Sequence, residues 1–346
     1  MFQLMESRSF SSLLVNFSAL FRKCLNNSIN LGNCFLLCDF DLLVFSTAMR
    51  KICCQTLVRA DDDGADNFLH IRDETRRKGL IYTEVLLPKT EDMVKKIKDF
   101  ASEIDVSDFD DWEGDLKKIT EGATVAEEAC KSLVHLYEKL IIEMKQKEDA
   151  ATLSAKDLGR LKQIYEEENE RLLNAAALHK HKKEKLQRLG LFLALPTLGI
   201  GTWLTKSKAK REQKEIDKSL SAANVAKQKG EKLTKTAKLT DFLIPAILSF
   251  LTGLTSCCAF LTTTRAELSE LREKGTEGQE STWKKRTVNL LRKHANEVES
   301  DCKVFISSST SIRTDLKAIP SEPSDENYVQ QWCADQIASL MLCVSQ

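Results

Sequence analysis

The sequence predicts an all-α protein: an elongated antiparallel helical bundle with long coiled-coil-like helices and a central apolar helical hairpin as its head. Three observations carry this prediction. The 346-residue chain has five prolines, and none lies between Pro88 and Pro196, so a long helix is permitted there. Apolar residues recur at alternating steps of four and three from Leu133 to Leu189. Two uncharged apolar stretches, Leu189–Thr205 and Phe242–Thr264, lie between charged, helix-patterned flanks.

Residues 1–60 differ from the rest of the chain and are expected to form an N-terminal segment of uncertain structure. They are rich in Ser, Phe, Leu, Asn and Cys, and they show no clean period. They lack the compact basic and apolar regions of a cleavable signal peptide. Three alternatives remain open for this segment: a short targeting or anchoring role, disorder, or absence from the mature protein. Met49 offers a second translation start, which would leave out residues 1–48.

Residues 61–188 are expected to form the first arm of the bundle. Thr90, Glu91 and Asp92 supply a helix N-cap with acids in the first turn. The heptad stripe then runs over the 57 residues from Leu133 to Leu189. At about 1.5 Å per residue this predicts a helix of about 85 Å that packs lengthwise on partner helices.

Residues 265–319 are expected to form the second arm, and residues 320–346 a proline break followed by a short helix. The same alternation of apolar positions returns between Val288 and Leu316. Pro320 and Pro323 then end the helix. A last amphipathic piece, Tyr328–Val344, is expected to cap the bundle.

Residues 189–264 are expected to form the apolar head, with a basic linker at 206–240. The first stretch has 17 residues and the second has 23, which correspond to helices of about 25 Å and about 35 Å. Only the second comfortably spans a hydrocarbon core of about 30 Å. Between them, Lys206–Lys238 carries eleven Lys and Arg against four acids. This segment is expected to be the basic surface of the protein, or else a solvated amphipathic helix.

Three interpretations of the apolar pair remain open. It could be a permanent two-span membrane anchor, a hairpin that a soluble bundle hides and then exposes, or a core hairpin of a soluble coiled-coil interaction protein. An exposed apolar surface of this size must be covered in water. We therefore expect conditional burial, with a transition from a soluble to a membrane-associated form.

The expected site residues fall into two groups. Large apolar side chains of both stretches are expected to enter the bilayer: Leu189, Leu191, Phe192, Leu193, Leu195, Leu198, Ile200, Trp203, Leu204, Phe242, Leu243, Ile244, Ile247, Leu248, Phe250, Leu251, Leu254, Phe260 and Leu261. Cations that open the linker are expected to contact lipid headgroups: Lys206, Lys208, Lys210, Arg211 and Lys214.

Composition and motifs argue against other classes of function. Lys plus Arg and Asp plus Glu are equal at 51 each, so no net field favours nucleic acid. We find no phosphate loop, nucleophile elbow or zinc-protease motif, and expect no enzyme activity, cofactor or metal. The eleven cysteines show no disulfide or zinc spacing and are expected to be reduced thiols. His179 on the heptad stripe is expected to be a tolerated seam histidine, with a protonation trigger as the alternative.

Long heptad-patterned helices that flank a central apolar hairpin resemble the α-helical pore-forming toxin superfamily, which includes cytolysin A, haemolysin BL and the non-haemolytic enterotoxins. The resemblance covers roughly residues 80–320 and rests on architecture and the order of apolar segments. It implies a helical bundle whose apolar head packs down in solution and then inserts into a bilayer. The implied partners are the lipid bilayer and either further copies of the chain on the membrane or a helical partner protein. The chain is expected to be cytoplasmic before release.

Overall fold

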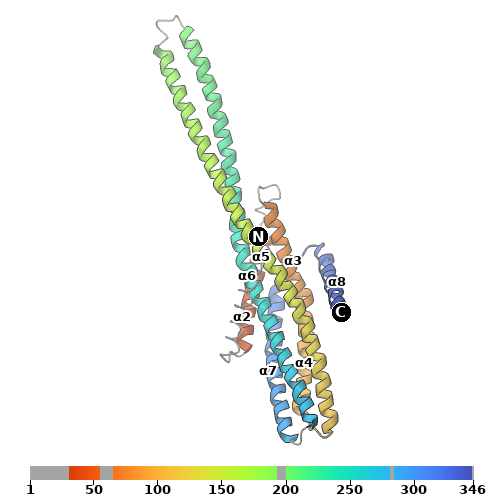
Figure 1. The fold of residues 1–346 in the computed structure, drawn as a ribbon. Coiled ribbons are helices and arrows are strands. Elements are labelled where there is room, and N and C mark those ends of the chain that lie inside the picture. Colours follow the sequence, from red (N-terminus) through yellow and green to blue (C-terminus); the bar gives the residue numbers. More distant parts are fainter. Residues whose placement is uncertain (1–30, 55–64, 193–199, 281–283, 345–346) are drawn as a thin grey trace, which may run out of the picture. The chain divides into compact units, whose positions relative to one another are not determined.

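The computed structural model describes residues 31–54, 65–192, 200–280 and 284–344, and over these ranges the chain is helical and contains no strand. The fold class that the sequence predicts is therefore confirmed. The elements are α2 (Leu31–Cys53), α3 (Ala65–Ile81), the π-helical turn η1 (Tyr82–Leu86), α4 (Leu87–Val106), α5 (Trp112–Phe192), α6 (Ile200–Glu280), α7 (Lys284–Leu316) and α8 (Asp325–Val344) (Figure 1).

Two helices of 81 residues each, α5 and α6, dominate the chain. Helix α5 contains the whole heptad stripe, as predicted. Helix α6 takes in both the basic segment and the second apolar stretch, because Lys206–Lys238 consists mainly of Lys, Ala, Glu and other residues that favour helix. Pro245 lies inside α6 and cannot donate a backbone hydrogen bond there, yet the helix continues past it.

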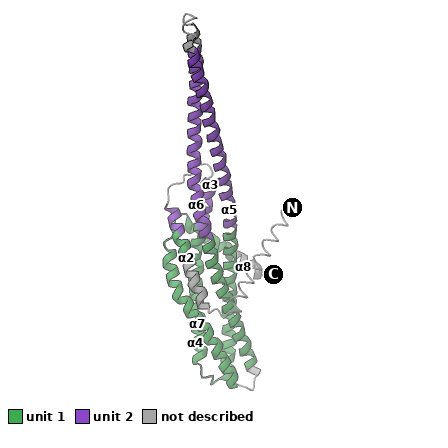
Figure 2. Ribbon diagram, turned by 90° about the vertical axis from the view of Figure 1, so that its left-hand side faces the viewer, with its two compact units in different colours: residues 1–47, 76–145, 248–346 green, residues 48–75, 146–247 purple. Residues whose placement is uncertain are grey.

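The chain divides into two compact units (Figure 2). Unit 1 consists of Met1–Thr47, Arg76–Lys145 and Leu248–Gln346, and unit 2 of Ala48–Thr75 and Gln146–Ile247. This division differs from the boundaries that the sequence suggests. The reason is that α5 and α6 each contribute one part to each unit, whereas the boundaries expected from the sequence lie where its composition changes.

Unit 1 has an aromatic core. Phe250 of α6 stacks on Phe45 of α2, with 4.2 Å between ring centroids, and meets the edge of Tyr82 at 5.8 Å. Tyr82 lies edge-on to Tyr137 of α5 at 6.1 Å. The Tyr137 hydroxyl lies 3.1 Å from Thr90 Oγ1 of α4, so its polar end is also partnered. These contacts join α2, η1, α4, α5 and α6 in one core.

Helix α2, which lies within the N-terminal segment whose structure the sequence leaves uncertain, belongs to this core. Leu42 and Phe45 are fully buried. Gly253 of α6 permits the contact, because a Cβ at that position would lie 2.8 Å from Leu42 Cδ2. Helix α2 and α6 are therefore closely packed in unit 1.

The C-terminal helix α8 is held to unit 1 by buried polar contacts. The Arg76 guanidinium, 1% exposed, forms an ion pair with Asp325 at the start of α8. Burial by itself raises the pKa of Asp325, but hydrogen bonds from Arg76, the Glu322 backbone and Arg77 outweigh it and lower the pKa. The Trp332 indole donates to Glu143 of α5 at 3.2 Å. Helix α8 follows Pro320 and Pro323, where the sequence predicts a short helix.

Unit 2 is built mainly from an antiparallel pair of helices, α5 from residue 146 and α6 up to residue 247 (Figure 1, Figure 2). Its buried seam uses small or aliphatic side chains: Ala176, Ala209, Ile216, Ala223, Ala226 and Leu233. Small residues let two helix backbones approach closely but remove little apolar area from water. This seam is therefore thinner than the aromatic core of unit 1.

Candidate functional site

The candidate site is the end of the α5–α6 pair in unit 2, where α5 ends at Phe192 and α6 begins at Ile200 (Figure 1). Two polar contacts fix the antiparallel register near this end. His179 Nδ1 lies 2.6 Å from Glu212 Oε2, and Lys183 Nζ donates to Gln213 Oε1 at 2.6 Å. The two helices therefore bring their charged stretches together beside the apolar segment Leu189–Thr205.

Exposed cations from both helices surround this end, and we call this set the basic collar. Residues 180–188 and 206–214 together hold ten Lys and Arg and two Glu, which are Glu184 and Glu212. Glu212 faces His179 in the seam. The exposed members that define the collar are Lys180, Lys182, Lys185, Arg188, Lys206, Lys208, Lys210, Arg211 and Lys214.

The five lysines and arginines expected to contact headgroups all lie in the collar and are exposed. The α5 members were missed as site residues. The signal was present, since five cations precede Leu189 in the sequence. Only the antiparallel pairing places them beside the α6 cations.

Among the predicted inserting residues of the first stretch, only Leu189 has a described side chain. Leu189 is 54% exposed. Leu193, Leu195 and Leu198 lie outside the described residues, and the side chains of Leu191, Phe192, Ile200, Trp203 and Leu204 are also not described. Their role as membrane contacts stays a prediction.

The second apolar stretch, Phe242–Thr264, lies in the middle of α6. Its predicted inserting residues divide by exposure. Leu243, Ile247, Phe250, Leu254, Phe260 and Leu261 are buried, Ile244 and Leu251 are half-buried, and Phe242 and Leu248 are exposed. Phe260 stacks on Phe305 of α7 with 5.1 Å between centroids, and Tyr82 Oη lies 3.4 Å from Cys257 Sγ. Partners inside unit 1 therefore cover much of this stretch.

The two apolar stretches are not the two sides of one hairpin tip. Thr205 and Phe242 belong to one continuous helix, so at about 1.5 Å per residue about 55 Å of helix separates them. The basic segment that the sequence suggests as a linker is itself the second arm of the α5–α6 hairpin. The apolar segment at its tip is Leu189–Thr205 alone.

Among the described helices, α6 is the one that is long and apolar enough to cross a bilayer. Within Thr205–Gly278 it holds an 18-residue window of mean hydropathy 1.9, of which 44% is buried inside the protein. The core helix of a soluble protein can be equally long and apolar. This property therefore allows insertion but does not require it.

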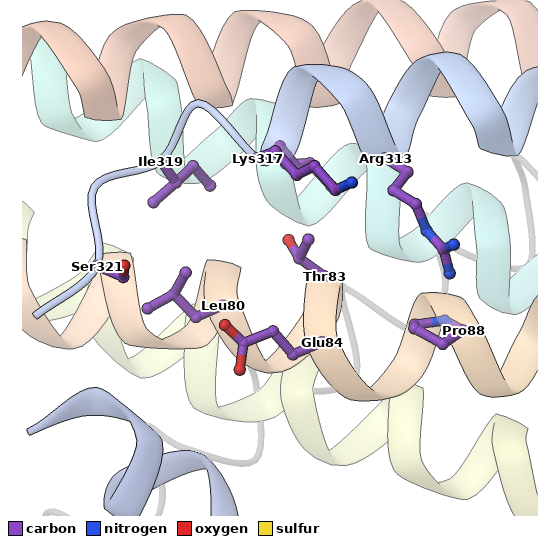
Figure 3. Close-up of a pocket in the computed structure, with 9 residues that line it drawn as sticks. Leu80, Thr83, Glu84, Pro88, Arg313, Lys317, Ile319 and Ser321 are labelled. Carbon is purple, nitrogen blue, oxygen red and sulfur yellow. The ribbon is translucent and has the colours of Figure 1, made fainter. Parts of the chain in front are cut away.

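A shallow groove of about 350 Å³ lies in unit 1 between η1 and the end of α7 (Figure 3). Glu84 and Thr83 line one side of it, and Arg313 and Lys317 line the other. Burial, followed by the charges of Asp325 and Glu326, raises the pKa of Glu84. Arg313 is engaged with Glu91 of α4 at 2.8 Å. None of the predicted site residues lines this groove.

Among the described side chains, no cluster of His, Cys, Asp and Glu could hold a metal ion. The cysteines whose side chains are described form no disulfide with one another: Cys53, Cys54, Cys130, Cys257, Cys258, Cys302 and Cys333. His179 is half-buried in the α5–α6 seam, paired with Glu212. It occupies the seam position that the heptad stripe predicts.

No protein-family model matches the sequence, and no curated protein matches it significantly. Solved structures do match the fold. The SmhB pore of the tripartite alpha-pore forming toxin Smh from Serratia marcescens is 13% identical, with a TM-score of 0.58, over 77% of this chain and 98% of that chain. A soluble AhlC triple head mutant from the tripartite toxin AHL of Aeromonas hydrophila is 12% identical, with a TM-score of 0.53, over 79% and 98%.

The pre-pore form of AhlB from the same Aeromonas hydrophila toxin is 13% identical, with a TM-score of 0.51, over 86% of this chain and 99% of that chain. All three are named as toxin components and none as an enzyme. At these identities the likeness concerns the fold. This chain therefore has the fold of the tripartite alpha-pore forming toxin components, and the resemblance seen in the sequence is confirmed at that level.

Proposed function

We propose that this chain is a membrane-active, non-enzymatic helical bundle of the pore-forming-toxin type, which hides apolar segments in water and inserts them into a bilayer. The observation that carries the proposal is the end of the α5–α6 pair. There, nine exposed Lys and Arg from two helices flank a 17-residue uncharged segment. The shared fold with toxin components named as soluble, pre-pore and pore forms supports it.

The collar is suited to the first step, which is docking on an anionic membrane. Each Lys or Arg held near an anionic surface contributes about 1 kcal/mol, and the attraction falls off within a Debye length of about 10 Å at 0.1 M salt. The collar cations proposed to meet lipid phosphates include the five predicted on α6 and the four that α5 adds. Leu189, Leu191, Phe192, Leu193, Leu195, Leu198, Ile200, Trp203 and Leu204 are proposed to enter the headgroup and acyl boundary.

The tip alone is too short to complete insertion. Its 17 residues would reach about 25 Å as one straight helix, less than the hydrocarbon core of about 30 Å. The second stretch of 23 residues reaches about 35 Å. We therefore place Phe242, Leu243, Ile244, Ile247, Leu248, Phe250, Leu251, Leu254, Phe260 and Leu261 in a second step, in which this stretch leaves its cover.

The second step must overcome the packing of unit 1. Uncovering the rings of Phe250 and Phe260 exposes apolar area, at about 25 cal/mol per Å². A bilayer that buries the same area again binds the open form better and so shifts the population toward it. Assembly with further copies or with a helical partner would bury more of this surface. The proposal places the chain in the cytoplasm before release.

Co-flotation with liposomes tests the docking step. We expect the chain to float with anionic liposomes at low salt and to lose binding as salt rises. The triple variant K182Q/K185Q/R188Q should bind at least tenfold more weakly, because three contributions of about 1 kcal/mol are lost. A matched control replaces three α5 cations outside the collar, as K156Q/R160Q/K162Q. Equal binding by the two variants, or no binding by the unmodified chain, contradicts the proposal.

Carbonate extraction separates this proposal from the permanent two-span anchor. The burial of Phe250 and Phe260 among partners in unit 1 favours a conditional transition. We expect the chain to be extracted into the soluble fraction before a target membrane is supplied. Recovery entirely in the membrane pellet at that stage would instead support the anchor.

A further inference from the structure

Four carboxyl groups meet between α6 and α7 in unit 1. Glu267 and Glu270 come from α6, and Glu297 and Asp301 come from α7. We call these four the carboxyl cluster. Glu267 Oε2 is buried and has no hydrogen-bond partner. Like charges at a packed helix interface repel one another, and an unpaired buried carboxylate is costly.

No Lys or Arg whose side chain is described forms an ion pair with Glu267 or Asp301. Helix α6 has two nearby cations, Arg265 and Arg272, which face Glu127 of α5 at 3.7 and 2.8 Å. From α7, His294 Nδ1 lies 3.3 Å from Glu270 and 3.5 Å from Glu297.

Of the remaining neighbours, Lys293 of α7 lies 3.7 Å from Glu297, which is exposed, and the others bring no positive charge. Cys130 of α5 and Cys302 of α7 are buried thiols, and burial raises the pKa of both. At the end of α4, Asp105 accepts a hydrogen bond from Asn296 at 3.1 Å and is itself an acid. Lys293 and His294 contact only the exposed Glu270 and Glu297, so Glu267 and Asp301 depend on protons for their neutralisation.

The titration of the cluster has a defined direction. Burial, followed by Asp301, Glu297 and Glu270, raises the pKa of Glu267 to about 8. Burial, followed by Glu297, raises the pKa of Asp301 to about 6. An acid whose pKa is raised on folding favours the packed state while it is protonated. That contribution is complete below the unfolded pKa of about 4 and is lost as pH rises through the folded value.

We propose that the carboxyl cluster is a proton-held latch: while it is protonated α7 stays packed on α6, and as it ionises α7 loosens. The contact that the latch holds closed matters for function, because Phe305 of α7 covers Phe260 of the second apolar stretch. Loosening α7 uncovers that ring. The link to membrane insertion rests on the proposed function, whereas the latch itself does not.

Hydrogen exchange of the full chain without lipid tests the latch separately from membrane activity. Amides of residues 291–312 are followed at pH 5, 6, 7 and 8 in the unmodified chain and in Glu267→Gln, which cannot ionise. At each pH, dividing the exchange rate of the unmodified chain by that of Glu267→Gln cancels the intrinsic effect of pH. Because opening releases one proton from Glu267, this ratio should grow up to about tenfold per pH unit between pH 5 and 7.

Two further variants sharpen the test. For Asp301→Asn, the exchange rate of the unmodified chain divided by that of the variant should stop growing above about pH 6, where the native Asp301 is already ionised. The control Glu273→Gln removes an exposed acid from the same helix and should exchange like the unmodified chain. A Glu267→Gln ratio that stays constant from pH 5 to 8, or that equals that of the control, overturns the latch.

Discussion

The two compact units hold their helices together in different ways. Unit 1 interlocks large rings, with Phe45, Tyr82, Tyr137 and Phe250 in one contiguous group. Unit 2 joins α5 to α6 along a seam of alanines, while both helices carry a dense set of exposed charges. Burial of large rings stabilises a fold strongly, and an alanine seam does so weakly. The difference teaches that the aromatic core of unit 1 is more strongly stabilised than the α5–α6 seam of unit 2, whose helices present a charged surface.

The largest expected effect comes from removing a ring from unit 1. Phe250→Ala should lower the free energy of unfolding by about 3–5 kcal/mol, because the cavity lies between Phe45 and Tyr82. Phe242→Ala, only a few residues away on α6 but 51% exposed, should cost under about 1 kcal/mol. Urea unfolding curves give both values. Equal losses would remove the contrast between a packed and an exposed part of the apolar stretch.

The next effect concerns ion pairs. Arg76→Met should destabilise unit 1 by about 3 kcal/mol, because Asp325 would remain buried with only the partly exposed Arg77 as its cationic partner. The lowered pKa of Asp325 means that this contribution is present above its unfolded pKa and is lost as pH falls through the folded value. The variant should therefore match the unmodified chain most closely in acid.

The matched change for unit 2 is Lys147→Met. Lys147 lies 3.7 Å from Glu74, and both side chains are partly exposed. We expect a loss under about 1 kcal/mol. Thermal unfolding at pH 7 compares the two variants, and a larger loss for Lys147→Met would reverse our ranking of the two units.

A third contrast tests the alanine seam. Ala226→Leu should lower the free energy of unfolding by about 1–3 kcal/mol. Ala226 is 5% exposed, so a larger side chain must push the two helices apart. Its neighbour Val225 is 52% exposed, so Val225→Leu should change stability by under about 0.5 kcal/mol. Circular dichroism during urea unfolding measures both. An Ala226→Leu variant that is more stable than the unmodified chain would mean that the two helices leave room for a larger side chain at this position.

Much of the helical framework could be predicted from local sequence. The absence of proline between Pro88 and Pro196 and the heptad stripe predict α5 because helix formation depends on neighbouring residues. Helix α2 was missed although Leu42, Phe45, Met49 and Ile52 recur at helical spacing. Few charged residues mark an outer face in this helix, so the period is weak in the sequence.

The site could be predicted only in part. The α6 cations stand out in composition, but the α5 cations join them only through antiparallel pairing, which is a long-range property. Burial of the second apolar stretch also depends on partners far away in sequence, such as Phe45 and Phe305. One consequence is practical: Asp at Phe250 would disrupt the core of unit 1, so loss of membrane activity in such a variant says nothing about insertion.

Dye release from anionic liposomes by the full chain tests the central claim most directly. The chain should release dye, and L189D/L195D should abolish release because two charges at the tip oppose entry into the bilayer. The matched control L153D/L178D changes two leucines on α5 that are 59% and 56% exposed, and it should keep its activity. Undiminished release by L189D/L195D, or equal loss in the control, would contradict the assignment of the tip as the inserting segment.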